Sequence, residues 1–387
     1  MNNISIIGGG IAGLVTALSF EKLNIPYKLY ERAETLKAIG AGIWLSPNAL
    51  QVFEWLDPNL LEEIQKNGNS FTRILVADHK LNPISDSDQT FVKNRFGYTT
   101  MAIHRGKLQK ILYSYLNTNN IVLGKSFKKY FLNNDSSYKV EFTDGTTIKT
   151  SAIVGADGIH SKVRKQLFPK SKIRYSGQTC WRGVSNYELP PKLASIGFTL
   201  WGQKLQFGVS KIEDGKTYWF AVKLSLPNQK DNKETLKKNL TKLFSEYHTI
   251  ANDLIKNTPI NNIIRGNLSD LELLDKWSEN NISLIGDAAH SMTPDLGQGG
   301  AQAIEDAYYL SNLIKKSKNN TSAFDKFYAY RKNKVIKLVK NSRITSKIAI
   351  TNKPLEILRN FILRMTPTKL LQKQMIELYQ IDKVIAK

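Results

Sequence analysis

A glycine-rich segment near the start of the chain constrains its fold more than any other feature. Residues 8–13 read Gly-Gly-Gly-Ile-Ala-Gly, between the apolar segment Ile4–Ile7 and a helical pattern over residues 11–23. A second strand pattern follows over residues 27–31, so the chain begins as strand, glycine turn, helix and strand. In such a βαβ unit the N-terminus of the helix presents free N–H groups to a phosphate. The segment therefore predicts an α/β domain that binds a dinucleotide.

The glycines and one acid of this segment have separate expected roles. Gly8 permits the tight turn, Gly10 lets a pyrophosphate approach the backbone, and Gly13 lets the helix pack closely on the sheet. Glu31 ends the second strand about 20 residues on, where an acid accepts hydrogen bonds from a ribose. A glycine turn without a ligand is the weaker alternative, because strand, helix and acid agree in position. The predicted dinucleotide contacts here are Gly8, Gly10, Ile11, Ala12, Gly13, Glu31 and Arg32.

Two further segments combine an aspartate with glycines after a short apolar strand. Residues 155–164 read GADGIHSKVR, and residues 286–300 read GDAAHSMTPDLGQGG. Each offers a carboxylate together with backbone N–H groups. The second segment enters a helix through Gly297, Gly299 and Gly300, a turn that can direct N–H donors at negative charge. Either segment alone is equally compatible with an ordinary strand-to-helix turn.

Together, and in this order, the three segments resemble the flavin monooxygenases of the para-hydroxybenzoate hydroxylase type. The resemblance covers residues 1–340 and is closest to the branch of salicylate- and urate-hydroxylase-like enzymes and zeaxanthin epoxidase. Residues 103–105 (IHR), 175–177 (YSG) and 180–183 (CWRG) are also similar to that branch.

The resemblance implies FAD as the cofactor and NAD(P)H as a transient co-substrate. The first motif would hold the ADP half of FAD, with Arg105 close to it. Asp157 and Gly158 would serve the pyrophosphate region and NAD(P)H, and Asp287 would contact the ribityl chain. The loop 294–300 would lie against the isoalloxazine ring, where its N–H groups stabilise negative charge. The residues implied there are Pro294, Gly297, Gly299 and Gly300 for catalysis, with Gly297, Gly300 and Ala301 also binding the cofactor.

The implied activity is that of a single-component monooxygenase. NAD(P)H reduces the flavin, O2 adds as a C4a-hydroperoxide, and this species hydroxylates or epoxidises a small electron-rich substrate. One alternative is a reductase or dehydrogenase of the same fold with little oxygen chemistry. Another is a flavoprotein at the membrane surface that acts on a lipophilic isoprenoid. A non-enzymatic interaction protein would have no reason to keep three FAD segments.

The strand patterns along the chain predict how the domains are organised. Residues 172–225 alternate β-branched and aromatic side chains, which favours an antiparallel or mixed sheet inserted into the dinucleotide domain. The predicted fold is therefore α/β with α+β elements: a Rossmann-like FAD-binding domain, an inserted β-sheet substrate domain and C-terminal helices. The predicted limits are 1–70, 98–172 and 265–340 for the FAD-binding domain, 71–97 and 173–264 for the substrate domain, and 341–387 for the helices.

Substrate contacts are expected from the inserted sheet where it faces the flavin. The strand pattern selects Trp181, Arg182, Phe207 and Trp219, and Asp295 is added because it lies beside the flavin loop. Any of these side chains is equally compatible with sheet packing or a structural ion pair. No metal-ligand spacing occurs among the scattered histidines, so no metal is expected.

Composition bounds the cellular setting and the partners. The only cysteine is Cys180, which fits a reducing cytoplasm. Glycines interrupt the apolar start of the sequence, so we expect a buried strand leading into a helix there and not a secretion signal. The net charge is +22, but lysine supplies most of the basic residues, whereas nucleic-acid sites favour arginine. We therefore predict a soluble cytoplasmic monomer or homodimer that binds a small substrate and O2 and no nucleic acid.

The C-terminal tail is strongly basic. Residues 326–387 hold 15 basic and 3 acidic residues, and apolar residues recur there at helical spacing. A basic amphipathic helix can rest weakly on an anionic membrane. The favoured alternative is a helix packed on its own domain or on a partner subunit.

Overall fold

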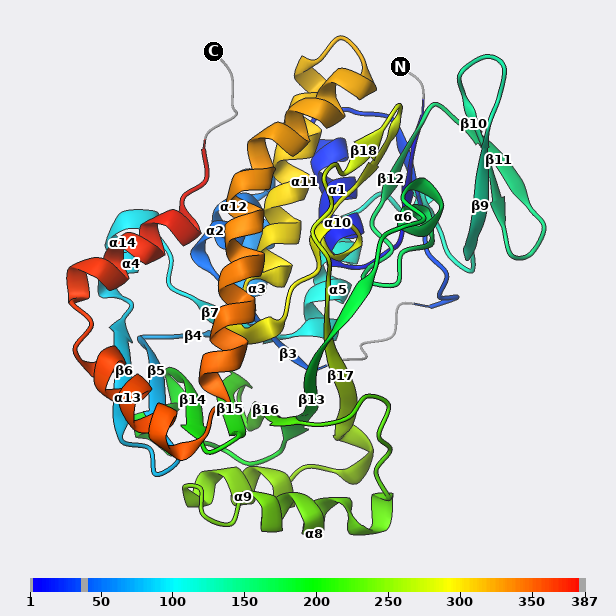
Figure 1. Ribbon diagram of the computed structural model, residues 1–387. Helices are drawn as coiled ribbons and strands as arrows, with labels where there is room; N and C mark the ends of the chain where they lie inside the picture. Colours follow the sequence, from blue (N-terminus) through cyan, green and yellow to red (C-terminus); the bar gives the residue numbers. More distant parts are fainter. Residues whose placement is uncertain (1–2, 36–40, 383–387) are drawn as a thin grey trace.

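The dinucleotide motifs all leave one sheet. The computed structural model, which describes residues 3–35 and 41–382, contains a six-stranded sheet in the order β18-β19-β12-β1-β2-β8 (Figure 1). Strand β1 (Ile4–Ile7) pairs in parallel with β2 (Tyr27–Tyr30) and β12 (Ala152–Gly155), and β12 pairs in parallel with β19 (Ile282–Leu284). The three motif loops follow β1, β12 and β19, so they emerge at one edge of the sheet. Ligands bind at this edge of open α/β sheets.

The opening βαβ unit forms as its sequence predicts. All four residues of β1 are buried, and α1 (Ile11–Lys22) packs between this sheet and α11 (Gly299–Lys316). The sheet ends in β8 (Ile121–Val122) on one side and the antiparallel β18 (Ser278–Glu279) on the other. Elements that surround it are α2 (Pro47–Leu56), α3 (Pro58–Lys66), α4 (Thr90–Phe96), α5 (Arg105–Ser114), α6 (Lys162–Leu167) and α10 (Asp287–His290).

Two small sheets extend this part of the molecule. One consists of β3 (Gly42–Leu45), β7 (Met101–His104) and β4 (Gly68–Ser70). The other consists of β9 (Phe127–Leu132), β10 (Tyr138–Phe142) and β11 (Thr147–Thr150). The dipeptide Asp144-Gly145 is a strong hairpin signal in the sequence, and it lies in the turn that joins β10 to β11. Gly145 has the positive φ of +84° that this turn requires.

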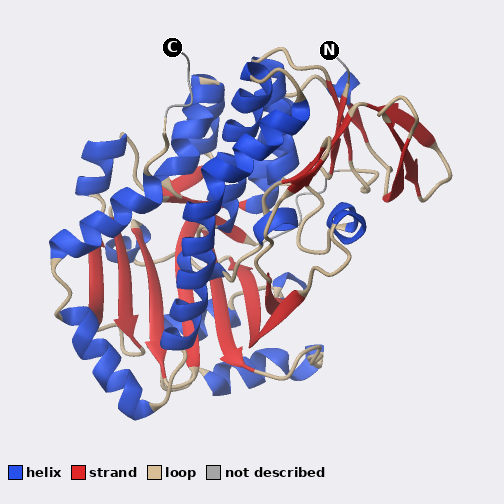
Figure 2. Ribbon diagram, turned by 45° about the horizontal axis from the view of Figure 1, so that its top comes forward, coloured by secondary structure: helices blue, strands red, loops and turns tan. Residues whose placement is uncertain are grey.

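A separate seven-stranded sheet has the order β17-β13-β16-β15-β14-β5-β6. Its pairs are antiparallel except for β14 with β5, so the inserted sheet is mixed, as predicted. Figure 2 shows its strands side by side. The predicted domain limits stay a prediction. The strands are β5 (Arg73–Asp78), β6 (Pro83–Asp88), β13 (Ile173–Ser185), β14 (Ile196–Gly202), β15 (Leu205–Glu213), β16 (Lys216–Leu224) and β17 (Ile264–Leu271).

Helices cover one face of this sheet. The sequence predicts a helix over about residues 232–247, and α8 (Lys233–Leu243) lies within that range. A second helix that was not predicted, α9 (Thr249–Lys256), follows it, and both lie below the sheet in Figure 1. His248 caps α9, its Nδ1 accepting a hydrogen bond from the Ile250 amide at 3.3 Å. The opposite face of the sheet is turned toward the dinucleotide motifs.

Three helices complete the described part of the chain. Helix α12 (Asn320–Ala349) runs beside α11 and reaches the seven-stranded sheet, followed by α13 (Lys353–Arg364) and α14 (Thr368–Tyr379) (Figure 1). Because proline disrupts a helix interior, the sequence predicts breaks near Pro354 and Pro367. Both are confirmed: Pro354 lies in the first turn of α13, and Pro367 precedes α14. Among the residues described, no helix has the length and apolarity to cross a bilayer.

Candidate active site

The first glycine motif leaves no room for side chains except where a ligand would approach. Gly8 has a φ of +110°, and a Cβ added there would lie 2.5 Å from the carbonyl oxygen of Ala156. A Cβ at Gly13 would lie 1.9 Å from the carbonyl oxygen of Gly8, so only glycine lets α1 pack against this turn. A Cβ at Gly10, in contrast, would meet open space. No acidic residue lies in the first turn of α1, so its N-terminus keeps the positive end of its dipole for an anion.

Glu31 organises the turn beside this motif. Its Oε2 accepts a hydrogen bond from the Gly9 amide at 2.6 Å, and its Oε1 accepts one from the Ala33 amide at 2.8 Å. Gln109 donates to the carbonyl oxygen of Gly9 at 2.8 Å. Arg32 is exposed just beyond. The predicted acid therefore lies at the end of β2, against the glycine turn.

The aspartate of the second motif shapes its own loop. Asp157 Oδ2 accepts hydrogen bonds from the amides of Lys162 and Val163 at 2.8 and 3.2 Å, which caps the start of α6. Burial raises the pKa of Asp157 above its ordinary value, although these hydrogen bonds oppose the shift. Gly158 has a φ of +78°, so the loop turns where a side chain would be strained. The Asp157 carboxylate therefore orders the backbone of its own turn, through hydrogen bonds that it accepts from that backbone.

Arg164 links the second motif to the third. Its side chain is buried, and it donates from Nη1 to the carbonyl oxygen of Ala288 at 3.1 Å. Its charge acts on both Asp157 and Asp287. Arg164 is part of the second motif, but no role was predicted for it from the sequence.

Asp287 opens toward the space between the motifs. Solvent reaches its carboxylate, yet enough protein surrounds it that desolvation raises its pKa, against the opposing charges of His290 and Arg105. A Cβ added at Gly299 would lie 4.0 Å from Oδ1 of Asp287. The third motif thus folds back on itself, so that its carboxylate faces the first turn of α11. Arg105, predicted to lie close to the cofactor, comes to the same place from the start of α5.

The loop 294–300 ends at the N-terminus of α11. Pro294 is exposed, Gly297 has a φ of +63°, and Ala301 is buried in the helix. The first N–H groups of a helix have no acceptor within it, so those of Gly299 and Gly300 are available to a ligand. The first turn of α11 contains no acidic residue to compete for them.

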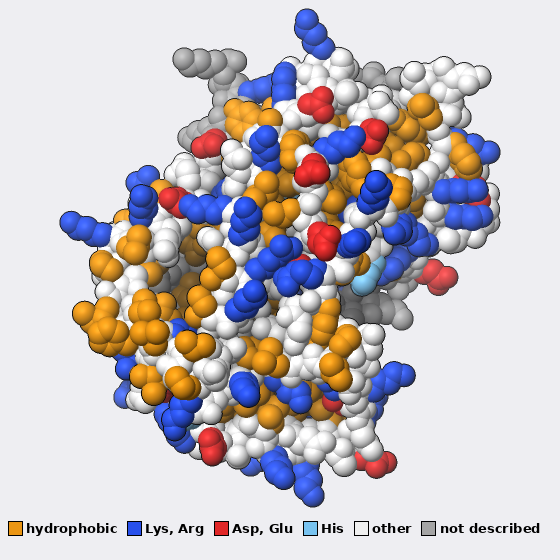
Figure 3. All heavy atoms as spheres, viewed as in Figure 1, with side chains coloured by type: hydrophobic (Ala, Val, Ile, Leu, Met, Phe, Trp, Pro, Cys, Tyr) orange, Lys and Arg blue, Asp and Glu red, His pale blue; other side chains and the backbone are white. Residues whose placement is uncertain are grey.

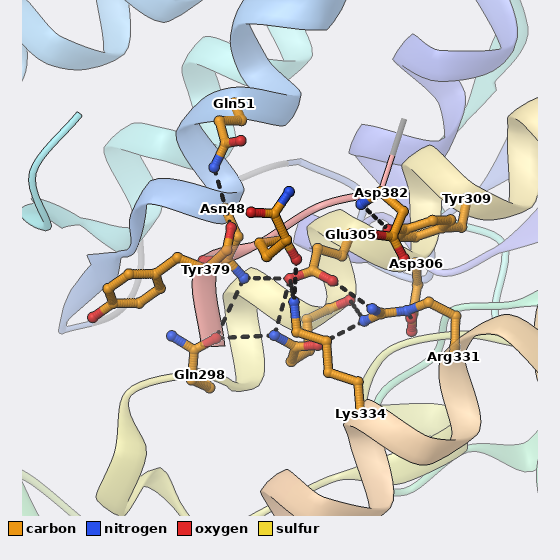
Figure 4. A network of polar contacts seen from close by, with 12 residues as sticks. Asn48, Gln51, Gln298, Glu305, Asp306, Tyr309, Arg331, Lys334, Tyr379 and Asp382 are labelled. Carbon is orange, nitrogen blue, oxygen red and sulfur yellow. Dashed lines mark hydrogen bonds and ion pairs between the residues drawn. The ribbon is translucent and has the colours of Figure 1, made fainter. Parts of the chain in front are cut away.

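A buried polar network holds this helix start in place (Figure 4). Gln298 donates to Ser46 Oγ at 2.8 Å, and Asn48 donates to Gln298 Oε1 at 3.3 Å. Asn48 also donates to Glu305 Oε1 at 2.5 Å. Arg331 of α12 is 2% exposed and forms ion pairs with Glu305 and, at 2.9 Å, with Asp306. The hydrogen bonds and ion pairs of this network therefore hold the loop 294–300 in place.

Asp306 carries this support back to the third motif. Its Oδ2 accepts a hydrogen bond from the Gly286 amide at 2.9 Å and contacts His290 Nε2 at 2.6 Å. Although burial alone would raise the pKa of Asp306, His290 and Arg331 bring it below its ordinary value. His290 therefore acts in positioning the loop.

These motifs fit a long dinucleotide. They combine a glycine turn in which Gly8 and Gly13 have no room for a side chain, two helix N-termini and an exposed carboxylate between them. Pyrophosphate suits the first helix N-terminus, and the second suits a ring that carries negative charge. The residues present are thus those that FAD requires.

The seven-stranded sheet supplies a wall opposite the flavin loop. Arg182, Tyr218 and Phe220 lie on this face, and Arg182 lies within hydrogen-bonding reach of the Tyr218 hydroxyl. Trp44 of β3 donates to Ser210 Oγ at 3.1 Å, and the Tyr218 ring covers Gly42. The wall is mostly aromatic, with Arg182 as its cation.

Asp295 is the predicted acid of the flavin loop opposite this wall. Among the described residues its Oδ2 is buried and has no hydrogen-bond partner. Burial raises the pKa of Asp295, although Thr293 and Ser346 oppose the shift. Ser346, which also acts on Asp295, exchanges two hydrogen bonds of 3.0 Å with Gln178, four residues before Arg182 on β13. Asp295 therefore lies on the side of the sheet that carries Arg182.

The three other predicted substrate residues lie on the opposite face. Phe207 and Trp219 are stacked with ring centroids 5.4 Å apart, and both are fully buried beneath α8 and α9. Trp219 donates to Thr258 at 2.8 Å, and Trp181 donates to Asp231 at 2.6 Å. The alternative of sheet packing therefore describes Trp181, Phe207 and Trp219, because strand alternation turns them away from the flavin loop.

The comparisons with known proteins agree with the geometry of the three motifs. A family model described as an FAD binding domain matches residues 1–342. The chain belongs to this FAD-binding family. Within it, the aurachin C monooxygenase/isomerase of Stigmatella aurantiaca is 33% identical over 328 residues, which cover 85% of this chain and 84% of that protein. The zeaxanthin epoxidase of Spinacia oleracea is 32% identical over 333 residues, 81% of this chain and 48% of that protein.

A third relative matches nearly the whole chain. The 2-heptyl-3-hydroxy-4(1H)-quinolone synthase of Pseudomonas aeruginosa strain PAO1 is 31% identical over 370 residues, which cover 94% of both chains. As predicted, the chain is an FAD-dependent monooxygenase that hydroxylates or epoxidises a small substrate. FAD is its cofactor, and NAD(P)H is the co-substrate typical of this family.

Solved structures share the fold of this FAD-binding family member. HpxO of Klebsiella pneumoniae, complexed with FAD and uric acid, superimposes with a TM-score of 0.89 at 24% identity, over 97% of this chain and 96% of that one. A salicylate hydroxylase substrate complex gives a TM-score of 0.80 at 20% identity, over 98% of this chain and 96% of that one. At these identities the likeness establishes the fold alone.

Sequence reasoning missed Trp44, Tyr218 and Phe220. The signal for the last two was present, because alternation along β16 puts Tyr218 and Phe220 on the face opposite Trp219. Pairing of Arg182 with Phe220 then selects which face carries the arginine. Trp44 lies on a strand of another sheet, and nothing in the sequence points to its contact with Ser210.

Proposed function

We propose that this monooxygenase oxygenates a small, electron-rich nitrogen heterocycle of the quinolone type that carries an apolar chain. One observation carries the proposal: the aromatic wall holds the guanidinium of Arg182, and the flavin loop opposite it holds Asp295, whose buried Oδ2 has no partner among the described residues. A heterocycle with one carbonyl and one ring N–H complements this pair. The name of the Pseudomonas relative contains such a ring with a heptyl chain, and that relative spans nearly all of this chain.

The chain's own residues would divide the work of binding. We assign the ADP half of FAD to the turn at Gly8, Gly10 and Gly13 with Glu31, and the ribityl region to Asp287. The N–H groups at Gly299 and Gly300 would stabilise negative charge on the ring. When bound, reduced FAD supplies the activated oxygen after reaction with O2. NAD(P)H would approach the same cleft beside Asp157 and Gly158.

The substrate would be oriented by hydrogen bonds at its two ends. Arg182 donates to the ring carbonyl, and the ring packs against Tyr218 and Phe220. Asp295, when ionised, accepts a hydrogen bond from the ring N–H. It takes up this proton as positive charge develops on the ring during oxygen transfer. The aromatic wall excludes water from the reacting carbon. A negatively charged substrate is disfavoured because Asp295 would repel it.

The test is anaerobic reduction of the FAD-loaded protein by NADH and by NADPH with candidate substrates present. A 2-alkyl-4-quinolone should accelerate loss of the flavin absorbance and be oxygenated when air is admitted. Urate, salicylate and zeaxanthin should each have a smaller effect. Acceleration by urate or salicylate instead of the quinolone would reject the substrate class while leaving the monooxygenase activity intact.

Two variants locate the substrate, and a neighbouring variant serves as control. Arg182→Gln should raise the KM for the quinolone about 10- to 100-fold, the value of a hydrogen bond to a charged donor. Trp181→Phe, one residue away on the opposite face, should leave that KM unchanged. Equal effects of the two substitutions would contradict the placement. FAD content should be the same in both proteins.

The pH dependence tests the role of Asp295. Because burial raises the pKa of Asp295, its carboxylate is protonated over a higher pH range than an ordinary aspartate. Activity that needs the ionised form should therefore rise with pH through that raised pKa. Asp295→Asn should lower kcat about 100-fold and remove this rise. A variant that keeps the same pH profile would exclude Asp295 as the proton acceptor.

A further inference from the structure

Helix α13 turns two charged side chains inward. Glu356 and Arg359 are only 8% and 6% exposed. Arg359 donates from Nη1 to the carbonyl oxygens of Ile348 and Ala349, each at 3.1 Å, and its guanidinium lies over the Trp201 ring at 5.1 Å. A helix of a soluble protein usually presents the opposite arrangement, with its apolar side on the core.

The outward face of α13 is apolar. At 100° per residue, its exposed apolar side chains cover a continuous arc of about 160°, opposite the inward-facing pair Glu356 and Arg359. Figure 3 shows hydrophobic side chains gathered over this part of the molecule. We call these residues the α13 face: Leu355, Ile357, Leu358, Phe361, Ile362 and Met365, which are 54%, 64%, 54%, 62%, 55% and 66% exposed.

Neighbouring helices extend this surface. Ile344 and Ile348 at the end of α12 are 54% and 42% exposed, and the hydrogen bond from Arg359 places Ile348 directly beside α13. Leu370 at the start of α14 is 46% exposed. Soluble monomers rarely expose large contiguous apolar patches unless a partner or a membrane covers them.

The charges around the α13 face are almost all positive. Residues 340–376 contain eight basic residues and one acidic residue, and that acid, Glu356, is buried. Helical geometry puts Lys353 and Arg364 together along one border of the α13 face. The exposed cations of this region are Lys340, Lys347, Lys353, Arg364, Lys369 and Lys373. An anionic surface complements them, whereas a second copy of a chain with net charge +22 would repel them.

We propose that the α13 face inserts into the interface of an anionic lipid bilayer. The six apolar side chains would lie at the boundary of headgroups and acyl chains, and the flanking lysines and arginines would bind lipid phosphates. The protein then lies on the membrane without crossing it. The prediction that this tail packs its apolar side on its own domain does not hold for α13, because those side chains are exposed.

Helix α13 packs beside the substrate wall, on the same face of the seven-stranded sheet. Leu363, on the inner side of α13, packs in one apolar cluster with Trp201, Cys180 and Val222. Cys180 lies next to Arg182 on the same sheet face. Membrane attachment therefore holds the proposed active site close to where apolar molecules dissolve. The attachment itself does not depend on which substrate is oxygenated.

Sedimentation with vesicles tests the attachment. The FAD-loaded protein should co-sediment with vesicles of phosphatidylglycerol and phosphatidylcholine, and much less with phosphatidylcholine alone. Raising the salt concentration should weaken the first association, because exposed charges are screened. Failure to bind either kind of vesicle would overturn the proposal. Flavin reduction measured without vesicles is unaffected by that outcome, so the monooxygenase function is tested separately.

Matched variants separate the α13 face from general surface hydrophobicity. The triple substitution Leu358→Gln, Phe361→Gln and Ile362→Gln should lower the vesicle partition coefficient at least about tenfold, since each loses buried apolar surface. The control replaces Leu132 and Leu226, which are 63% and 74% exposed elsewhere, with Gln and should bind like the wild type. Equal binding by the triple variant would reject the proposal.

The oligomeric state tests whether a second copy of the chain covers the α13 face instead of lipid. Sedimentation velocity should find the same association state for the wild type and the triple variant. A wild-type dimer that the triple substitution dissociates, with no vesicle binding by either protein, would show that a second copy covers the α13 face. That result would also overturn the proposal.

Discussion

Helices α12 and α13 each bury an arginine, but their aromatic side chains lie on opposite sides. Helix α12 buries both Arg331 and Phe324, whereas α13 buries Arg359 and exposes the ring of Phe361. The difference teaches that polarity alone does not decide burial. On α12 the buried charge is retained by its counter-charges, and on α13 the apolar face lies outside, where we propose that lipid covers it.

The pairing on α12 is nearly complete. Arg331 donates to Asp306 Oδ1 at 2.9 Å and to Gln302 Oε1 at 2.7 Å, and it pairs with Glu305. Lys334 reaches the other oxygen of Glu305 at 2.8 Å. Removing one member of such a group leaves its partners charged in a poorly polarisable interior. The network thus couples the stability of the fold to the position of the flavin loop.

Breaking the network at its centre should have the largest effect on stability. Arg331→Met keeps the side-chain volume but leaves Glu305 and Asp306 without their main counter-charge. We expect the free energy of unfolding to fall by about 3–5 kcal/mol. Urea denaturation measures it, with Lys340→Met, exposed on the same helix, changing it by less than about 0.5 kcal/mol. A loss of similar size in both variants would show that the network is not special.

The pH dependence of stability tests the same network, with a smaller expected loss of folding free energy. Burial alone would raise the pKa of Glu305, but Arg331 and Lys334 bring it below its ordinary value. A depressed native pKa contributes stability at neutral pH that is lost as the pH falls through it. Glu305→Gln should therefore cost about 1–3 kcal/mol at pH 7, and the difference from the wild type should shrink in acid. Denaturation curves from pH 7 downward measure this. A difference that does not change with pH would contradict it.

The smallest effect on stability is expected on α13. Phe361→Gln should change the free energy of unfolding by less than about 0.5 kcal/mol, because the ring is 62% exposed. Phe324 of α12 is fully buried, and Phe324→Gln should cost several kcal/mol, on the order of a buried aromatic truncation. Thermal unfolding without lipid measures both. If Phe361→Gln were as costly as Phe324→Gln, the α13 face would be part of the core.

The site nearest the cofactor was largely predictable from sequence. Gly8, Asp157 and Asp287 each follow a buried parallel strand, and neighbouring parallel strands end at one edge of a sheet. Backbone requirements therefore brought the three motifs together before any contact was known. Their individual contacts with FAD stay predictions.

The substrate wall was less predictable. Trp181 and Arg182 are adjacent, so strand alternation allows only one of them to face the flavin loop. The choice between the two faces depends on where α8 and α9 pack, and that packing brings together residues far apart in the sequence. Phe207 and Trp219 were predicted as substrate residues from their strand pattern, but aromatic residues on a strand are equally typical of a hydrophobic core.

The sequence by itself determined the dinucleotide fold, the FAD-binding family and the basic character of the C-terminal helices. Those properties depend on local glycines, on strand periodicity and on counted charges. Only the tertiary structure decided which face of the seven-stranded sheet holds Arg182 and which side of α13 meets solvent. The reason is physical: a periodic pattern defines two faces of an element, and the packing partner alone decides which of them is buried.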